Sequence, residues 1–244
     1  MGARFTLQQF SGVFAIRNPA GQHYTLIGGQ AVNYWAERYL EAEPGLQKYI
    51  PFTSQDIDFC GSRDDVIYIA GQLKLAPTFP PKVAMTALAG AIPILIDQEE
   101  TIIEVVRNVP GVELNQINTL AVEMTWQDAS LRVLDPISLL ACKVELALTV
   151  SQQKRQDAVH LKILLRCVRG FLRELLMQVE QGNVPVKGWL GAVNRLFKLA
   201  KTKHGRRAAQ KYAFNWSDVL PLAEIYQSKN AKIRLFREKQ LPVI

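Results

Sequence analysis

Two aspartates one residue apart, Asp56 and Asp58, stand in the segment SQDIDF (Ser54–Phe59). Side chains alternate between the two faces of a β-strand, so both carboxylates are predicted to point the same way while the apolar residues between and after them enter the core. Neighbouring carboxylates repel each other unless a cation lies between them, and Mg²⁺ takes oxygen ligands. A third carboxylate from a neighbouring strand would complete a two-metal site for phosphoryl transfer, and the best candidate is Glu104, flanked by β-branched residues in IIEVV. The alternative for a DxD pair alone is a solvated turn or strand edge.

A glycine pair, Gly28 and Gly29, separates a short β-type run, Tyr24–Ile27, from a helical pattern that begins at Gln30. Glycine lets the backbone approach a ligand closely, and a helix N-terminus offers unpaired N–H groups and the positive end of the helix dipole to a phosphate. The alternative is a tight turn that uses glycine only for its positive φ angle. Neither GxGxxG nor GxxxxGK(S/T) occurs, so a dinucleotide-binding or P-loop site is not supported.

The elements that must position these residues change in type along the chain. Strands are predicted over residues 24–27, 52–60, 92–96, 101–107, 120–126 and 131–134, with helices near 10–14, 30–40 and 64–73. Asp135 followed by Pro136 is typical of a helix start, and from there only helices are predicted. These cover about 136–150, 153–181, 187–202 and 217–227, with a weaker one after 229. The sequence therefore predicts an α+β protein, with one domain over 1–135 and a helical domain over 136–244.

Charge is divided unevenly between the two parts of the chain. Residues 1–150 contain 10 Lys/Arg and 16 Asp/Glu, a net charge of −6, whereas residues 151–244 contain 19 Lys/Arg and 6 Asp/Glu, a net charge of +13. The densest stretch, Lys187–Lys211, holds eight basic residues and no acid. This asymmetry predicts carboxylates that bind cations in the first part and a surface that attracts a polyanion in the second. The alternative is that Lys and Arg only solubilise exposed helix faces.

Composition excludes several classes of protein. With 244 residues, 48% hydrophobic and 21% charged, the chain is neither disordered, collagenous nor a coiled coil. No apolar run reaches the roughly 18 residues of a membrane span, and the N-terminus lacks the apolar stretch of a signal peptide. The three cysteines lie far apart and only three histidines occur, which argues against a disulfide framework or a structural zinc site. We therefore expect a cytoplasmic protein with no membrane partner.

The succession of an apolar strand, GG, a helix, SxDxD and a later strand acid resembles the nucleotidyltransferase superfamily of the DNA polymerase β type. Within it, GGQAVNYW, SQDIDF, IIEVVRNVPGV and LRVLDPISLLACKVELAL are most similar to the AbiEii-like abortive-infection toxins and related bacterial nucleotidyltransferases. The resemblance covers about residues 24–165. It implies that the GG strand and the DxD strand belong to one small mixed sheet flanked by helices.

The resemblance also implies roles for individual positions. Asp56, Asp58 and Glu104 correspond to the acids that bind Mg²⁺ or Mn²⁺, with Glu104 in place of the commoner Asp. Contacts to a nucleoside triphosphate (NTP) are implied for the glycine turn, the serine before DxD and one helical lysine: Gly28, Gly29, Gln30, Ser54 and Lys143. Gln30 replaces the Ser or Thr that usually follows the glycine pair, and Asp157 resembles the acid of a later motif. For Lys143 and Asp157 the alternative is an ordinary residue of a helix surface.

The implied activity is metal-dependent transfer of a nucleoside monophosphate from an NTP to a hydroxyl acceptor, with release of pyrophosphate. The basic second part favours the end of a tRNA or another RNA as acceptor. The segment Lys187–Lys211 is predicted to form one wall of a groove that leads to the aspartates, with RNA contacts from four of its residues: Lys198, Lys201, Arg206 and Arg207.

The toxin resemblance adds an antitoxin as a further expected partner, and a solvated face that docks an acidic antitoxin is the alternative for this segment. Two other functions stay open. One is an antibiotic-type small-molecule nucleotidyltransferase, whose acceptor pocket would be acidic, against which the acid-poor second part argues. The other is a catalytically silent binding module that keeps the fold.

Overall fold

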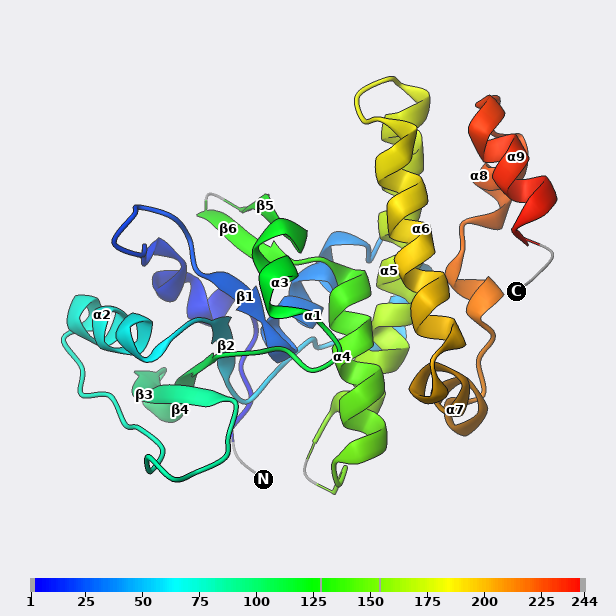
Figure 1. Cartoon of the computed structure of the whole chain (residues 1–244). Coiled ribbons are helices and arrows are strands. Elements are labelled where there is room, and N and C mark those ends of the chain that lie inside the picture. Colours follow the sequence, from blue (N-terminus) through cyan, green and yellow to red (C-terminus); the bar gives the residue numbers. More distant parts are fainter. Residues whose placement is uncertain (1–2, 128, 154, 242–244) are drawn as a thin grey trace. The chain divides into compact units, whose positions relative to one another are not determined.

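The computed structural model describes residues 3–127, 129–153 and 155–241 (Figure 1). The chain divides into two compact units: the first comprises Met1–Arg38 and Tyr49–Cys142, and the second comprises Tyr39–Lys48 and Lys143–Ile244. Over the described residues, the first unit contains a six-stranded mixed sheet with flanking helices, and the second contains helices without strands. The predicted α+β class is therefore confirmed.

The sheet of the first unit has the strand order β3-β4-β2-β1-β6-β5. β1 pairs in parallel with β6, and β2 pairs in parallel with β4, whereas the other neighbours are antiparallel. The strands are β1 (Thr25–Ile27), β2 (Ile57–Cys60), β3 (Leu88–Ile96), β4 (Glu99–Val106), β5 (Ala121–Trp126) and β6 (Ala129–Leu134). The two shortest strands, β1 and β2, lie at the centre, with the glycine pair directly after β1 and the DxD pair at the start of β2.

The strand predicted over 52–60 is shorter in the structure because its first half leaves the sheet. Ser54 instead forms an isolated antiparallel bridge with Phe5, in which the two backbone N–H groups donate to the opposite carbonyl oxygens at 2.8 and 3.0 Å. The N-terminal segment therefore holds the chain just before the two aspartates.

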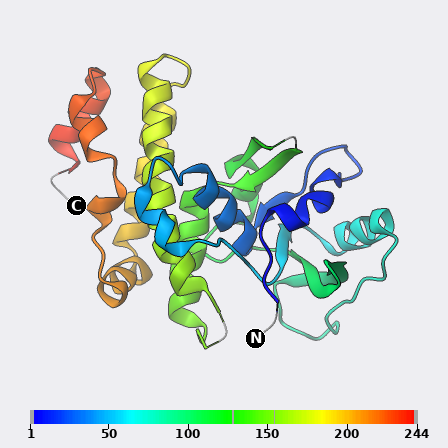
Figure 2. The same cartoon turned by 180° about the vertical axis from the view of Figure 1, so that it is seen from behind.

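One face of the sheet is buried and the other is partly open. The buried face carries large apolar side chains that are at most 5% exposed: Leu26, Ile57, Phe59, Ile103, Val105 and Val133. Val13 of η1 (Gln8–Ala15) and Ile69 of α2 (Arg63–Leu73) adjoin this face, and Figure 2 shows η1 in dark blue in front of the sheet. On the opposite face, Asp58, Cys60 and Glu104 keep partial exposure, so this is the face that a ligand can reach.

The remaining helices match the predicted ones in most places. They are α1 (Gly28–Arg38), η2 (Pro44–Tyr49), α3 (Leu114–Leu120), α4 (Pro136–Thr149), α5 (Asp157–Glu180), α6 (Val186–Lys201), α7 (Lys203–Tyr212), η3 (Trp216–Val219), α8 (Leu222–Gln227) and α9 (Ala231–Lys239). In the described part of the chain, no helix has the combined length and apolar character needed to cross a lipid bilayer.

The helix start predicted at Asp135 and Pro136 is confirmed. The buried Asp135 carboxylate accepts hydrogen bonds from the backbone N–H groups of Ile137 (3.0 Å) and Ser138 (3.3 Å) and from the Ser138 hydroxyl (2.6 Å). It thereby satisfies donors that the first turn of α4 leaves without partners.

The sequence analysis did not predict α3 or a separate α7. α6 ends because Thr202 adopts an extended backbone (φ −66°, ψ 159°), and the Thr202 hydroxyl then accepts from the backbone N–H of Gly205 at 2.8 Å to cap α7. The helix predicted over 217–227 is likewise split into η3 and α8, with Pro221 between them. Such breaks depend on single capping residues rather than on hydrophobic periodicity.

The observed units differ from the predicted domains in two respects. First, Tyr39–Lys48 belongs to the second unit although it precedes β2. The Glu43 carboxylate, only 1% exposed, pairs with the guanidinium groups of Arg169 and Arg173 on α5. The Tyr39 hydroxyl donates to Glu174, also on α5, at 2.7 Å. These polar contacts attach the segment to α5. The units also separate at Cys142 and Lys143, within α4, rather than between residues 135 and 136.

Candidate metal centre

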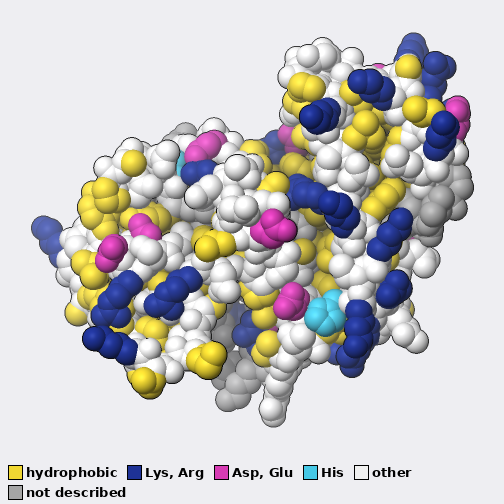
Figure 3. Space-filling model, in the orientation of Figure 1, with side chains coloured by type: hydrophobic (Ala, Val, Ile, Leu, Met, Phe, Trp, Pro, Cys, Tyr) yellow, Lys and Arg dark blue, Asp and Glu magenta, His cyan; other side chains and the backbone are white. Residues whose placement is uncertain are grey.

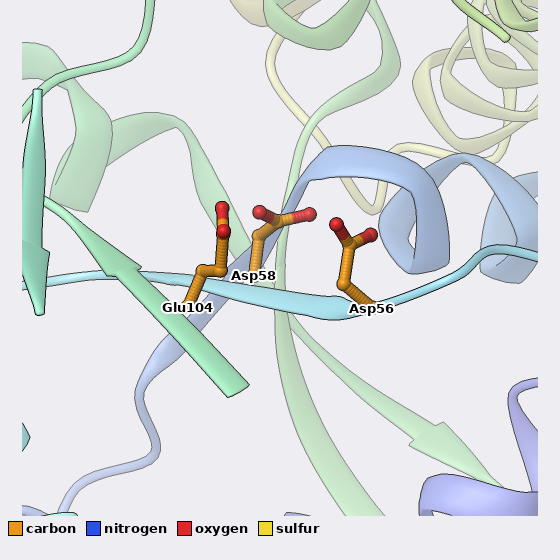
Figure 4. A group of neighbouring side chains, drawn as sticks. All are labelled: Asp56, Asp58 and Glu104. Atoms are coloured by element: carbon orange, nitrogen blue, oxygen red, sulfur yellow. The ribbon is translucent and has the colours of Figure 1, made fainter. Parts of the chain in front are cut away.

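The structure brings Asp56, Asp58 and Glu104 together on the open face of the first unit's sheet (Figure 4). One carboxylate oxygen from each residue lies within 4.8 Å of the others, and all three side chains are partly buried. The register explains this, because Asp58 lies directly opposite Glu104 in the parallel β2–β4 pair and Asp56 precedes Asp58 by two residues.

Neighbouring polar side chains hold Asp56 in place just before β2 begins. The buried Ser54 hydroxyl donates to Oδ1 of Asp56 at 3.1 Å. On β4, the buried Thr101 hydroxyl donates to the backbone carbonyl of Gln55 at 2.6 Å. Ser54, expected to contact the nucleotide, therefore orients a carboxylate, and Thr101 is a supporting residue that the sequence analysis missed because its partner is remote in sequence.

Gly28, the first residue of α1, touches the carboxylate cluster. Its φ angle is +66°, a conformation that L side chains rarely adopt. A Cβ atom at this position would lie 1.8 Å from Oδ2 of Asp58, far inside van der Waals contact. Both the backbone conformation and the space therefore require glycine, and the start of α1 is fixed against Asp58.

The N-terminus of α1 adds hydrogen-bond donors beside the carboxylates. The backbone N–H groups of the first turn, which includes Gly28, Gly29 and Gln30, have no acceptor within the helix and carry the positive end of its dipole. The Gln30 side chain is fully buried, donates to the carbonyl oxygen of Phe5 (3.0 Å) and accepts from Asn33 (2.9 Å). The side chain of Gln30 thus faces the protein interior, and a nucleotide contact from this residue is left to its backbone N–H.

Lys143 lies in the second unit, where it is 6% exposed and forms an ion pair with Asp157. Nζ of Lys143 is 2.8 Å from Oδ1 of Asp157, and Nε of Arg155 is 2.5 Å from Oδ2. Burial opposes ionisation of Asp157, but the Lys143 ammonium and the Arg155 guanidinium outweigh it and lower the pKa of the carboxyl to about 2. A phosphate would reach the Lys143 ammonium only if this pair opened.

The basic residues expected to contact RNA are exposed on consecutive helices of the second unit. Lys198 and Lys201 stand in the last turn of α6, and Arg206 and Arg207 in α7. Figure 3 shows Lys and Arg side chains in dark blue along this helical unit. Of the aromatic residues interleaved with them, Trp189 is buried against Phe236 with ring centroids 5.4 Å apart, whereas Phe197, Phe214 and Trp216 are partly exposed. The RNA contacts stay a prediction.

No family model matches the chain, and no curated protein matches its sequence.

Proposed function

We propose that this protein is a nucleotidyltransferase of the DNA polymerase β type that uses Mg²⁺ or Mn²⁺ to transfer a nucleoside monophosphate from an NTP to a hydroxyl acceptor. The observation that carries the proposal is the convergence of Asp56, Asp58 and Glu104 within 4.8 Å, with Gly28 at the start of α1 against them. A metal-bound triphosphate needs oxygen ligands for the metal and hydrogen-bond donors for the phosphates. The carboxylate cluster and the adjacent N-terminus of α1 can supply them.

The donor set fits a divalent cation that prefers oxygen ligands. Two oxygens on opposite sides of one Mg²⁺ are about 4.2 Å apart, since each Mg–O bond is about 2.1 Å. The observed spread of 4.8 Å is therefore close to a binding geometry and needs only a small contraction. When bound, the metal would neutralise charge on the phosphates and lower the pKa of a coordinated hydroxyl group.

The chain's own residues would share the remaining work. Asp56 and Asp58 would hold the cation, and Glu104 would complete the ligand set on the side of β4. The first backbone N–H groups of α1, at Gly28 and Gly29, would donate hydrogen bonds to the triphosphate and orient the pyrophosphate for departure. Ser54 and Gly28 would keep the aspartates in position.

An RNA end is the acceptor that the charge distribution supports. Residues 151–244 carry a net charge of +13, and Lys198, Lys201, Arg206 and Arg207 are exposed. Lys and Arg clusters attract nucleic acid by displacing the cations condensed on its phosphates. A cationic drug would be repelled by the same surface. A toxin role with an antitoxin partner follows only from the motif resemblance.

Incubation with each α-labelled NTP, Mg²⁺ or Mn²⁺ and total RNA tests the proposal. Label in RNA is expected, whereas label in the protein would identify self-modification. Label in neither, together with no Mn²⁺ or NTP binding by calorimetry, would contradict the proposal and favour a silent binding module.

A further inference from the structure

A second feature of the first unit is a hollow of about 490 Å³ on the same side of the sheet as the carboxylates. Thr25, Cys60 and Arg132 form its floor, and they are register partners on β1, β2 and β6. Its rim includes Arg107, which follows β4, and Leu114 of α3. The volume lies within the range of sites for small ligands or for one residue of a larger one.

The hollow lies directly beyond the carboxylates along the central strands. Cys60 follows Asp58 by two residues, so both point to the same face about 7 Å apart along β2. On β1, Thr25 borders the hollow, Ile27 lies opposite Asp58, and Gly28 begins α1. Along the direction of β1, the hollow therefore comes first, the carboxylates come next, and the N-terminus of α1 comes last.

This order matters for an in-line displacement at phosphorus. The attacking oxygen and the leaving oxygen lie on opposite sides of the phosphorus atom in such a reaction. With the leaving pyrophosphate at the N-terminus of α1, the attacking hydroxyl must come from the side of the hollow. A new P–O bond to that hydroxyl then forms as the bond to pyrophosphate breaks, and the hydroxyl proton passes to solvent water.

We infer that the hollow holds the end of the acceptor and that Arg107 and Arg132 select an acceptor with a phosphate next to its hydroxyl, namely the terminal nucleotide of an RNA. This inference rests on the proposed function, because it takes the position of the leaving group from it. It adds the place of the acceptor and the residues that recognise it.

The charged residues that line the hollow support an RNA terminal nucleotide as its ligand. Arg132 has a side chain only 17% exposed, its Nη2 donates to the carbonyl oxygen of Asn118 at 2.6 Å, and its Nε lies 3.7 Å from Oε1 of Glu123. Arg107 donates from Nη1 to the carbonyl oxygen of Leu88 at 2.6 Å. Both guanidinium groups are thus held at one end, and each has further N–H donors in a planar fork suited to phosphate.

The hollow offers little to a cationic acceptor. Asp65 is the one acid among its described lining residues, and its Oδ2 accepts from the Ser62 backbone N–H at 2.7 Å as part of the capping box of α2. His23 also lines the hollow, but burial and the nearby Arg17 lower its pKa, so the imidazole is neutral at pH 7. The charged lining residues are therefore two arginines and one aspartate, with Glu123 beside Arg132.

The test measures binding of a six-nucleotide single-stranded RNA of mixed sequence by fluorescence anisotropy, with the dye at either the 5′ or the 3′ end. The 3′ dye should weaken binding at least about tenfold relative to the 5′ dye, because it blocks entry of the terminal nucleotide. Leu114→Trp, which fills the hollow from an exposed position, and Arg107→Glu should each weaken binding of the 5′-labelled RNA by a similar factor, about 1.4 kcal/mol. The matched controls Leu95→Trp and Lys82→Glu change exposed positions outside the hollow and should bind as the wild type does.

Equilibrium dialysis with each of the four labelled NTPs and Mg²⁺ separates this inference from the proposed function. If the wild type binds none of the four, the proposed function fails. If it binds at least one NTP with Mg²⁺ but the hollow variants and the 3′ dye leave RNA affinity unchanged, or the wild type binds no RNA, the acceptor assignment is wrong. A 3′-terminal 4-thiouridine should also crosslink to residues 114–118, and a crosslink confined to α6 and α7 would overturn the assignment.

Discussion

The two units each contain a cluster of ionisable side chains, and the clusters are built on opposite principles. In the first unit, three carboxylates converge within 4.8 Å on an open sheet face. In the second, one buried carboxylate, Asp157, lies between the cations Lys143 and Arg155. Like charges held together cost stability, whereas a buried ion pair loses several kcal/mol of stability when one partner is removed and the other charge is left unpaired. The comparison supports the proposal that the first cluster binds a cation, and it predicts a structural role for the second.

Asp58→Asn gives the largest expected effect. It should reduce label transfer on the order of 10³-fold, because a metal-binding carboxylate in the reaction centre is lost. The unfolding temperature should stay the same or rise, because one of three like charges is removed. Glu100→Gln, at an exposed position on β4, is the matched control and should be fully active. A large fall in unfolding temperature for Asp58→Asn would assign the first cluster a structural role.

Asp157→Asn tests the ion-pair cluster of the second unit. It leaves the buried Lys143 ammonium without its carboxylate, so the free energy of unfolding in urea should fall by about 3 kcal/mol at pH 7. The native pKa of about 2 lies below the ordinary value of 3.8, so the stabilisation is complete above about pH 4 and is lost as the pH falls towards 2. The difference between variant and wild type should therefore shrink between pH 4 and pH 2. A difference that does not depend on pH would contradict the ionic explanation.

Gly28→Ala should affect both stability and activity. The new Cβ would displace the Asp58 carboxylate, so Mn²⁺ affinity should fall about tenfold or more. Gly21→Ala is the matched control, since Gly21 has φ +77° but nothing within 4 Å of an added Cβ. It isolates the backbone cost, about 1 kcal/mol, which should appear in the unfolding free energy without a loss of metal affinity. Equal Mn²⁺ affinities in the two variants would show that the Gly28 contact does not position Asp58.

Arg206→Glu combined with Arg207→Glu gives the smallest expected effect and extends the comparison to the exposed cations of the second unit. RNA affinity should fall several-fold, and the log–log dependence of affinity on salt should become shallower by roughly 0.7 for each RNA phosphate that the variant no longer neutralises. NTP binding should not change, because these residues are outside the carboxylate cluster. Filter binding at several salt concentrations provides the measurement, and an unchanged slope would favour a solvated helix face.

Local signals in the sequence were sufficient to predict part of the fold and part of the candidate site. Alternation in a strand placed Asp56 and Asp58 on one face, and the Asp135–Pro136 pair marked the start of α4. The proximity of Glu104 depended on β2 pairing with β4, which the chain reaches only after α2 and β3. The motif pattern predicted that Glu104 lies on a strand next to the DxD strand. In the structure, Asp58 lies directly opposite Glu104 in the β2–β4 pair.

Contacts between residues far apart in sequence account for the features of the candidate site that could not be predicted. Gln30 was expected to face the nucleotide, but Phe5, 25 positions earlier, accepts from its side chain in the interior. Gly28 was expected to approach a ligand or to allow a positive φ angle; it has a φ of +66°, but its contact with the Asp58 side chain was not predicted. Periodicity and motif spacing contain no information on such pairs, because each depends on the packed arrangement of several strands.

The attachment of Tyr39–Lys48 to α5 has a consequence for how the protein is made. Glu43 and Arg169 are 126 positions apart, so at 5–20 residues per second the ribosome needs roughly 6–25 s to supply the partner of that carboxylate. During this interval all six strands of the first unit have already been synthesised, since β6 ends at Leu134. A sheet that folds during synthesis therefore forms around a 10-residue insertion whose Glu43 carboxylate stays hydrated until α5 emerges.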